Sequence, residues 1–351
     1  MVVLYMAVSW TYSQTHLVVN LLPPSGQFGT RRMVSFVGSA RVHQSNVAHV
    51  CFVSKGGKDA ASPRYIFTKL EDVTREIFHP DDDALLNYLN DDGTTVEPEF
   101  YVPVIPMVIV NGTDGIGSGW SSYIPNHNPR HVIANLRRLI SGEESLPMAP
   151  HFHGFAGEIT KDAESEGTYN MKGIIERVDD TTIVIKELPI RCWTQSYKEL
   201  LEKMVTESEK HPAVLQDFKE NHTETEVHFM VTALKENIDE WEQQPGGLPK
   251  QFKLNGTIKT TNMVGFYERK LTKFKSTEDI LRIFFDIRHE FYVKRKALLV
   301  KNLNAEQLKL SNKARFVIEV CNEELVVSNR KKTDILGDLK ERGYDMFLEK
   351  S

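Results

Sequence analysis

Apolar and polar residues repeat with a helical period in one well-marked stretch of the chain, residues 129–142 (PRHVIANLRRLISG). Pro129 is typical of a first helical turn, where its missing N–H leaves no hydrogen bond unmade. Gly142 follows the last periodic residue, as glycine does at many helix ends. The stretch therefore predicts a helix. The apolar residues that we expect to share one face of it are Ile133, Leu136 and Ile140.

Shorter apolar runs follow in the middle of the chain. Residues 157–190 are rich in strand-forming residues, and GIIERVDDTTIVIKELP predicts a hairpin that turns at Asp179–Asp180. A helix is expected from about Ser196, and TEVHFMVTAL alternates like a strand. Short strands mixed with helices indicate an α+β arrangement. The residues expected inside are Leu200, Leu201, Met204 and Val205 on the helix, and Val227, Phe229 and Val231 on one face of the strand.

Two stretches before residue 129 have less regular patterns. Residues 81–99 (DDDALLNYLNDDGTTVEPE) are acidic and turn-rich, which favours a surface helix and a loop. Residues 100–122 (FYVPVIPMVIVNGTDGIGSGWSS) are apolar and then glycine-rich. Because prolines interrupt the apolar part, we expect an extended packed segment rather than a long central strand, ending in a glycine-rich loop.

The last part of the chain carries one long helical pattern. Ser276 is the expected N-cap, with Glu278 and Asp279 in the first turn. Apolar residues then recur in steps of three, four and seven, as in a coiled coil that needs a partner helix. The alternative is an ordinary amphipathic helix on a globular core. The stripe consists of Ile280, Phe284, Ile287, Phe291, Leu298, Ala305 and Leu308.

Composition indicates a soluble, globular chain, with 40% hydrophobic and 26% charged residues in 351. The net charge of −5 hides a basic segment, because residues 1–70 hold seven Lys or Arg residues and one acidic residue. Such a segment permits contact with DNA phosphates. No apolar run reaches the ~18 residues of a membrane helix, and the apolar first seventeen residues lack a basic start, which disfavours a secretory signal. Three cysteines without paired spacing, Cys51, Cys192 and Cys321, favour a reducing compartment.

One stretch, KDAASPRYIFT at 58–68, places a tyrosine directly after an arginine. By itself it is typical of a half-buried strand. It occurs, however, in one order with GQFGTR at 26–31, NGTDGIGSGWSS at 111–122 and FFDIRHEFYVKRK at 284–296. Together these four motifs resemble the DNA breakage–reunion core of eukaryotic type II DNA topoisomerases. The resemblance runs from about Val18 to Met346, with one interruption.

The resemblance implies roles for particular residues. Tyr65 matches the family's DNA-cleaving nucleophile, and Arg64 beside it can hold phosphate oxygens as charge builds on them. Ile116 matches an apolar wedge that enters a base step and helps to bend DNA. Asp81–Asp83 match a surface segment, so we predict no metal site there. The positions implied near the cleaved strand are Gln27, Thr30, Arg31 and Lys58.

The implied α+β fold has three parts. We expect a partial winged-helix domain over 1–102, a mixed α/β tower domain over 103–272, and a truncated coiled-coil arm over 273–351 that leads to the dimer gate. Residues 32–55 have no counterpart in the family's spacing and are expected to be an insertion, either a real exon or a gene-model error. The ATPase and magnesium-binding modules of the family would precede this region.

The family's activity is ATP-dependent passage of one DNA duplex through a transient double-strand break, made by a nuclear homodimer that uses Mg²⁺. We expect the 351-residue chain by itself to bind double-stranded DNA without cleaving it. The alternative reading is accordingly a catalytically incompetent DNA-binding fragment of such an enzyme. A tyrosine recombinase or nickase is disfavoured, because the surrounding basic and histidine residues that it would need are missing. We expect no membrane partner.

Overall fold

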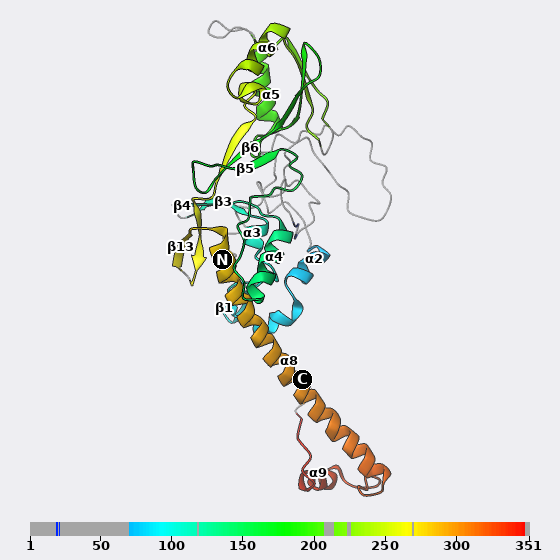
Figure 1. The fold of residues 1–351 in the computed structure, drawn as a ribbon. Coiled ribbons are helices and arrows are strands. Elements are labelled where there is room, and N and C mark those ends of the chain that lie inside the picture. Colours follow the sequence, from blue (N-terminus) through cyan, green and yellow to red (C-terminus); the bar gives the residue numbers. More distant parts are fainter. Residues whose placement is uncertain are drawn as a thin grey trace, which may run out of the picture. The chain divides into compact units, whose positions relative to one another are not determined.

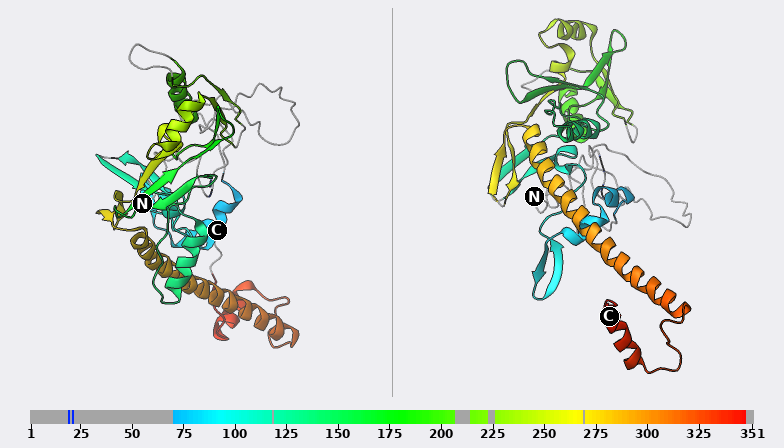
Figure 2. Two further views of the ribbon diagram at one scale, coloured as in Figure 1. Left: turned by 45° about the horizontal axis from the view of Figure 1, so that its top comes forward. Right: turned by 60° about the horizontal axis from the view of Figure 1, so that its bottom comes forward.

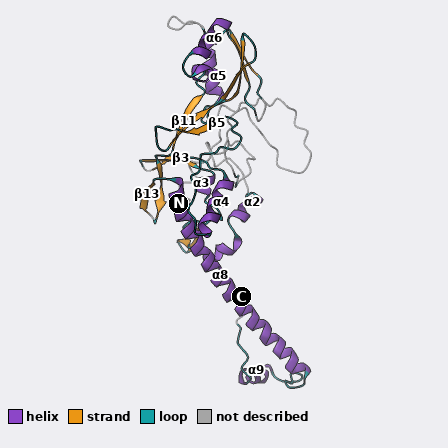
Figure 3. Ribbon diagram, in the orientation of Figure 1, coloured by secondary structure: helices purple, strands orange, loops and turns teal. Residues whose placement is uncertain are grey.

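The structure is a computed structural model in which the described residues form two compact units (Figure 1). The first contains the chain up to Pro80 and Leu86–Arg288, and the second contains Asp81–Leu85 and His289–Ser351. Helices and strands alternate in the first unit, and the second is helical (Figure 3). The fold is therefore mixed α/β. The residues that the structure describes are 19, 21, 70–117, 119–206, 214–222, 226–268 and 270–347.

The acidic stretch after residue 80 forms a short helix and a hairpin. Helix α2 (Asp72–Ile77) and the 3₁₀ helix η2 (Pro80–Leu85) precede the antiparallel strands β1 (Tyr88–Asp91) and β2 (Thr94–Pro98). The prediction of a helix and a loop was therefore wrong beyond η2. The two residues between the strands, Asp92 and Gly93, have φ of 46° and 85°. An Asp-Gly pair favours this left-handed two-residue turn and thereby closes a hairpin.

The proline-punctuated stretch also differs from the prediction of an extended segment. Its apolar end forms the short helix α3 (Met107–Val110), in which Ile109 and Val110 are fully buried. Pro106 precedes the helix in an extended conformation, which proline favours at a helix start. The glycine-rich loop is a hairpin of two strands, β3 (Thr113–Gly117) and β4 (Trp120–Ile124).

The predicted helix around 129–142 is confirmed as α4 (Pro129–Ile140), and the Asn128 side chain caps it by accepting a 2.9 Å hydrogen bond from the Arg130 N–H. The predicted face is wrong, because Ile133 and Ile140 are 38% and 73% exposed. The buried face carries Val132 and a polar residue, Asn135. The Asn135 amide exchanges two hydrogen bonds, of 2.8 and 2.9 Å, with the backbone of Leu146. This polar core position hid the correct face from an apolar count.

Two antiparallel sheets form the middle of the first unit. The strand orders are β11-β6-β5 in one and β7-β8-β10-β9 in the other. The chain passes between them at Gly173, where a Cβ atom would lie 2.3 Å from the Glu187 carbonyl oxygen. The strands are β5 (Glu158–Lys161), β6 (Thr168–Lys172), β7 (Ile174–Arg177), β8 (Thr182–Glu187), β9 (Asp217–Glu220), β10 (Phe229–Thr232) and β11 (Asn255–Lys259).

Three helices accompany the four-stranded sheet: α5 (Thr194–Val205), α6 (Lys235–Gln243) and α7 (Gly247–Gln251). The predicted hairpin at Asp179–Asp180 is confirmed, since β7 and β8 pair antiparallel on either side of it. The predicted helix near Ser196 is α5, which begins two residues earlier. The predicted interior residues all belong to one apolar cluster, with Leu201, Val227, Phe229 and Val231 buried and Leu200, Met204 and Val205 partly buried against it.

The first unit ends with strands β12 (Met263–Tyr267) and β13 (Lys270–Phe274) and the start of the long helix α8 (Thr277–Cys321), visible in both views of Figure 2. Ser276 is confirmed as the N-cap: its Oγ accepts from the Asp279 N–H at 3.2 Å, and its N–H donates to the Asp279 carboxylate at 3.3 Å. The predicted length of more than thirty residues is also confirmed, since α8 has 45.

In the second unit, buried Asp82 accepts two hydrogen bonds from Arg295, at 2.7 and 2.5 Å. Helix α9 (Lys332–Glu341) follows α8, and Glu319 accepts from both Arg315 and Arg342. The later apolar residues of α8 are largely exposed, so the pairing expected of a coiled coil stays a prediction. These exposed residues are Leu299, Val300, Leu303, Leu308, Leu310, Val317 and Ile318.

Candidate functional site

Of the residues that the family resemblance singles out, only Ile116 is described by the structure. The roles predicted for the others stay predictions. These residues, which lie outside the described part of the chain, are Gln27, Thr30, Arg31, Lys58, Arg64 and Tyr65.

The segment that carries those residues is anchored at both ends to one place. The Leu21 carbonyl accepts hydrogen bonds from the Glu71 N–H at 3.0 Å and from the Thr74 hydroxyl at 2.7 Å. Tyr65 lies six residues before Glu71, and Gln27 lies six residues after Leu21. Six fully extended residues span at most about 21 Å. The two predicted motifs are therefore tethered to the same joint.

This joint also touches the base of the β3–β4 hairpin. The Asn111 side chain accepts from the Val19 N–H at 3.0 Å and donates to the Val19 carbonyl at 2.9 Å. Asn111 is buried and comes two residues before β3. The hairpin that carries Ile116 and the tethers of the tyrosine motif thus share one piece of framework.

The end of the hairpin is apolar and open to solvent. Ile116 is 77% exposed opposite Ser121, and Trp120 is 58% exposed opposite Gly117. Gly119 turns the chain with a φ of 82°, which glycine adopts without strain. An isoleucine so exposed gains nothing from the protein's own core. Its position is what a side chain that inserts into another molecule requires.

Three side chains brace the hairpin on the face that carries Ile116. Asp114 and Tyr123 are directly paired across the strands, and their alternation puts them on the Ile116 face. Arg191 donates to the Asp114 carboxylate at 2.5 Å, and its guanidinium lies 4.1 Å from the centre of the Tyr123 ring. Sequence reasoning missed this brace, because Arg191 is 77 residues from Asp114 and no local pattern joins them.

The other edge of the hairpin is joined to β12. The Ser122 hydroxyl donates to the Val264 carbonyl at 2.6 Å and accepts from the Val264 N–H at 3.1 Å. The Asn262 amide donates to the backbone and hydroxyl oxygens of Ser121 at 3.1 and 2.9 Å. Bonds on both edges fix the hairpin, so that a load on its tip would be passed to the sheet below.

A buried histidine lies just beyond the hairpin. The His127 Nε2 is 3.4 Å from the Thr277 hydroxyl at the start of α8, and the Nδ1 has no hydrogen-bond partner. Burial lowers the pKa of His127 from 6.5 to about 4, against hydrogen bonds from the Ile109 and Pro125 backbone and the nearby Glu278 charge, which raise it. This histidine is neutral at pH 7.

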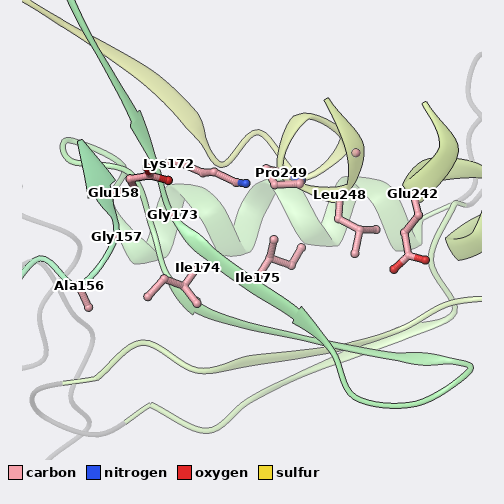
Figure 4. Close-up of a pocket in the computed structure, with 11 residues that line it drawn as sticks. Ala156, Gly157, Glu158, Lys172, Gly173, Ile174, Ile175, Glu242, Leu248 and Pro249 are labelled. Atoms are coloured by element: carbon pink, nitrogen blue, oxygen red, sulfur yellow. The ribbon is translucent and has the colours of Figure 1, made fainter. Parts of the chain in front are cut away.

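The first unit also contains a cavity of about 600 Å³ between β6, β7 and the α6–α7 region (Figure 4). Figure 4 shows Glu158 and Lys172 at one end and Glu242 at the other, with Ile175 and Leu248 between them. Glu242 already accepts from Arg177 at 3.0 Å. The cavity has no nucleophile beside a base, and we assign no chemistry to it.

Two further kinds of site, for a metal ion and for a membrane, are absent from the described residues. Across the described ranges, no three His, Cys, Asp or Glu side chains are arranged to hold a metal ion. Within the helices that the structure describes, none has a long enough apolar stretch to cross a membrane.

Comparisons with known proteins agree with these features. A family model for DNA gyrase/topoisomerase IV, of the A type, matches residues 52–351. DNA topoisomerase 2 of Arabidopsis thaliana is 46% identical over 336 residues, covering 95% of this chain and 21% of that protein. DNA topoisomerase 2-alpha of Mus musculus is 44% identical over 329 residues, covering 93% and 20%. The chain thus spans about a fifth of the length of the curated relatives it matches.

A solved structure is similar over nearly the whole chain. It is the crystal structure of the Plasmodium falciparum topoisomerase II DNA-binding, cleavage and re-ligation domain, with a TM-score of 0.79 and 38% sequence identity. The similarity covers 96% of this chain and 43% of that one.

Proposed function

Since the chain belongs to the DNA gyrase/topoisomerase IV family, we propose that it contributes the breakage–reunion chemistry of a type II DNA topoisomerase. The observation that carries the proposal is the shared framework of the Leu21–Glu71 joint and the Ile116 hairpin. It ties the tyrosine motif and an exposed apolar wedge to one place. The similarity to a DNA-binding, cleavage and re-ligation domain over 96% of the chain supports it.

In the proposed reaction, the Tyr65 phenol oxygen attacks a DNA phosphorus atom. The bond from phosphorus to one deoxyribose oxygen breaks, that oxygen takes up a proton, and a phosphotyrosine ester forms. The reverse reaction reseals the strand and frees Tyr65. A phenol has a pKa near 10, so it needs a prepared site. Arg64, always charged and fork-shaped, would hold the non-bridging oxygens as charge develops.

Ile116 would enter the DNA stack from the tip of its hairpin. Unstacking a base step costs a few kcal/mol, and a wedge offsets part of that cost through apolar contact. The brace of Asp114, Arg191 and Tyr123 would keep the wedge from yielding under this load. Gln27, Thr30, Arg31 and Lys58 would contact phosphates.

The family also suggests Mg²⁺ and ATP as cofactors, a homodimer as the working form and the nucleus as the location. The described residues do not fit a magnesium site, so we route no step through the metal. The proposed domain order is winged-helix over 1–102, tower over 103–272 and coiled-coil arm over 273–351. Double-stranded DNA would be the substrate.

The test uses a relative that supplies the rest of the enzyme. This chain replaces the matching fifth of Arabidopsis thaliana DNA topoisomerase 2, and protein–DNA adducts are trapped with denaturant in the presence of Mg²⁺. We expect adducts from the chimaera and none from its Tyr65→Phe variant, with DNA binding nearly unchanged, because the hydroxyl contributes little to ground-state binding. Adducts that persist in Tyr65→Phe would refute the assignment. Equal DNA binding without adducts in either protein would favour a DNA-binding role without cleavage.

A further inference from the structure

A second and larger cavity, of about 760 Å³, lies on the first unit between the end of α5 and the α6–α7 region. Its charged lining residues are all lysines: Lys203 on α5, Lys250 on α7 and Lys253 just after α7. In the described chain, these lysines make no ion pair with a carboxylate. A concentration of unpaired positive charge favours an anionic ligand.

The floor of this groove is apolar. Leu200, Met204 and Val214 line it and are only partly buried against the core of the four-stranded sheet. The Met204 carbonyl accepts from the Val214 and Leu215 N–H groups, at 2.9 and 3.0 Å, which fixes this wall. A groove of this volume with an apolar floor takes up side chains rather than a smooth phosphate backbone.

The lysine wall has a specific backbone geometry. Gly246 has a φ of 98°, and a Cβ atom there would lie 2.8 Å from the Lys250 side chain, so the lysine stem packs across the bare glycine. Lys253 has a φ of 51°, a left-handed conformation that non-glycine residues seldom adopt. A lysine kept in such a conformation suggests a use for its side chain.

We propose that this groove, named by Leu200, Lys203, Met204, Val214, Lys250 and Lys253, binds an acidic peptide segment of a partner protein, with apolar side chains on the floor and carboxylates on the lysines. The proposal does not depend on the DNA-cleaving function. A nucleic acid fits the site less well, because a phosphate backbone offers nothing to the apolar floor. A peptide that alternates carboxylates with leucines satisfies both features.

The probe is a fluorescent helical peptide with leucines at i, i+3, i+4 and i+7 and glutamates elsewhere, titrated into the full chain at low salt. The triple variant Lys203→Gln, Lys250→Gln, Lys253→Gly removes the charges, and glycine accepts the left-handed conformation at 253. We expect about tenfold weaker binding, since three exposed ion pairs are lost. Lys219→Gln, an exposed lysine on β9 outside the groove, is the matched control and should bind as the wild type does.

Two further arms make the result decisive. A peptide with serine in place of leucine should bind about tenfold more weakly, because its apolar contacts are lost. A photo-reactive leucine in the peptide should crosslink to residues of the groove. Equal binding by the triple variant, equal binding by the serine peptide, or crosslinks elsewhere would each overturn the proposal. So would a short DNA duplex that displaces the peptide and loses as much affinity in the triple variant, since the groove would then be a nucleic-acid surface. Equal thermal unfolding of all variants confirms that the fold is intact.

Discussion

Acid should weaken the framework beneath the Ile116 hairpin through one side chain, His127. Its pKa is lowered by burial from 6.5 to about 4, so the unfolded chain binds a proton more readily than the folded chain does. Stability from this group is complete above about pH 6.5 and is lost as the pH falls toward 4. The full difference of about 2.5 pKa units corresponds to about 3.4 kcal/mol.

The expected size at an accessible pH follows from the same two pKa values. Between about pH 8 and about pH 5, protonation of the unfolded chain at this one residue removes about 2 kcal/mol of unfolding free energy. His127→Gln keeps a polar side chain of similar length but cannot be protonated. Its unfolding free energy should therefore fall by about 2 kcal/mol less than that of the wild type over this range. The comparison of differences cancels the titration of other groups.

The measurement is equilibrium urea unfolding of both proteins at the two pH values, with coincident fluorescence and circular dichroism transitions as the check for two-state behaviour. Glu278 and His131 also act on the His127 charge and titrate in the same proteins, so both are left unchanged. His151→Gln is the control: the pKa of His151 is also lowered by burial, but this residue is much less buried. An equal pH response in wild type and His127→Gln would refute the reasoning.

Two other predictions concern charged pairs. Arg191→Ala, made in the chimaera, should reduce DNA bending measured by energy transfer between end-labelled dyes, much as Ile116→Ala does, while the salt dependence of binding stays unchanged because a brace rather than a phosphate contact is lost; an unaltered bend would contradict the brace. Asp82→Ala should lower the unfolding free energy by about 3 kcal/mol in urea, because it leaves Arg295 nearly buried without its carboxylate, whereas a loss no larger than that of the exposed control Asp81→Ala would show that the pair contributes little.

Local signals were enough to predict several elements of the fold. Ser276 and its acidic first turn marked the start of α8, and alternation in TEVHFMVTAL identified the buried face of β10. The Asp92-Gly93 turn was equally local, and its hairpin signal was passed over because the acidic run around it suggested a surface helix. The length of an acidic stretch is thus a weaker guide than its turn residues.

Other features depend on contacts that no local pattern contains. Asn135 occupies a core position of α4 because the Leu146 backbone satisfies its amide, so polarity pointed to the wrong face. Asp82 looked like part of a surface run but is buried against Arg295, 213 residues away. Ile116 was found through a motif, whereas Arg191, which braces it, could be found only in the folded chain.

The joint between Leu21 and Glu71 bears on the unmatched residues 32–55. Closing the segment between the two anchors costs entropy that grows only with the logarithm of its length, about 0.6 kcal/mol for each doubling. The 24 extra residues roughly double the segment, so they weaken the joint by well under 1 kcal/mol. Hydrogen bonds from Glu71, Thr74 and Asn111 at this place can offset such a cost. Any effect of residues 32–55 on DNA cleavage would therefore arise at the Tyr65 motif that they precede, and not from a failure of the framework that holds it.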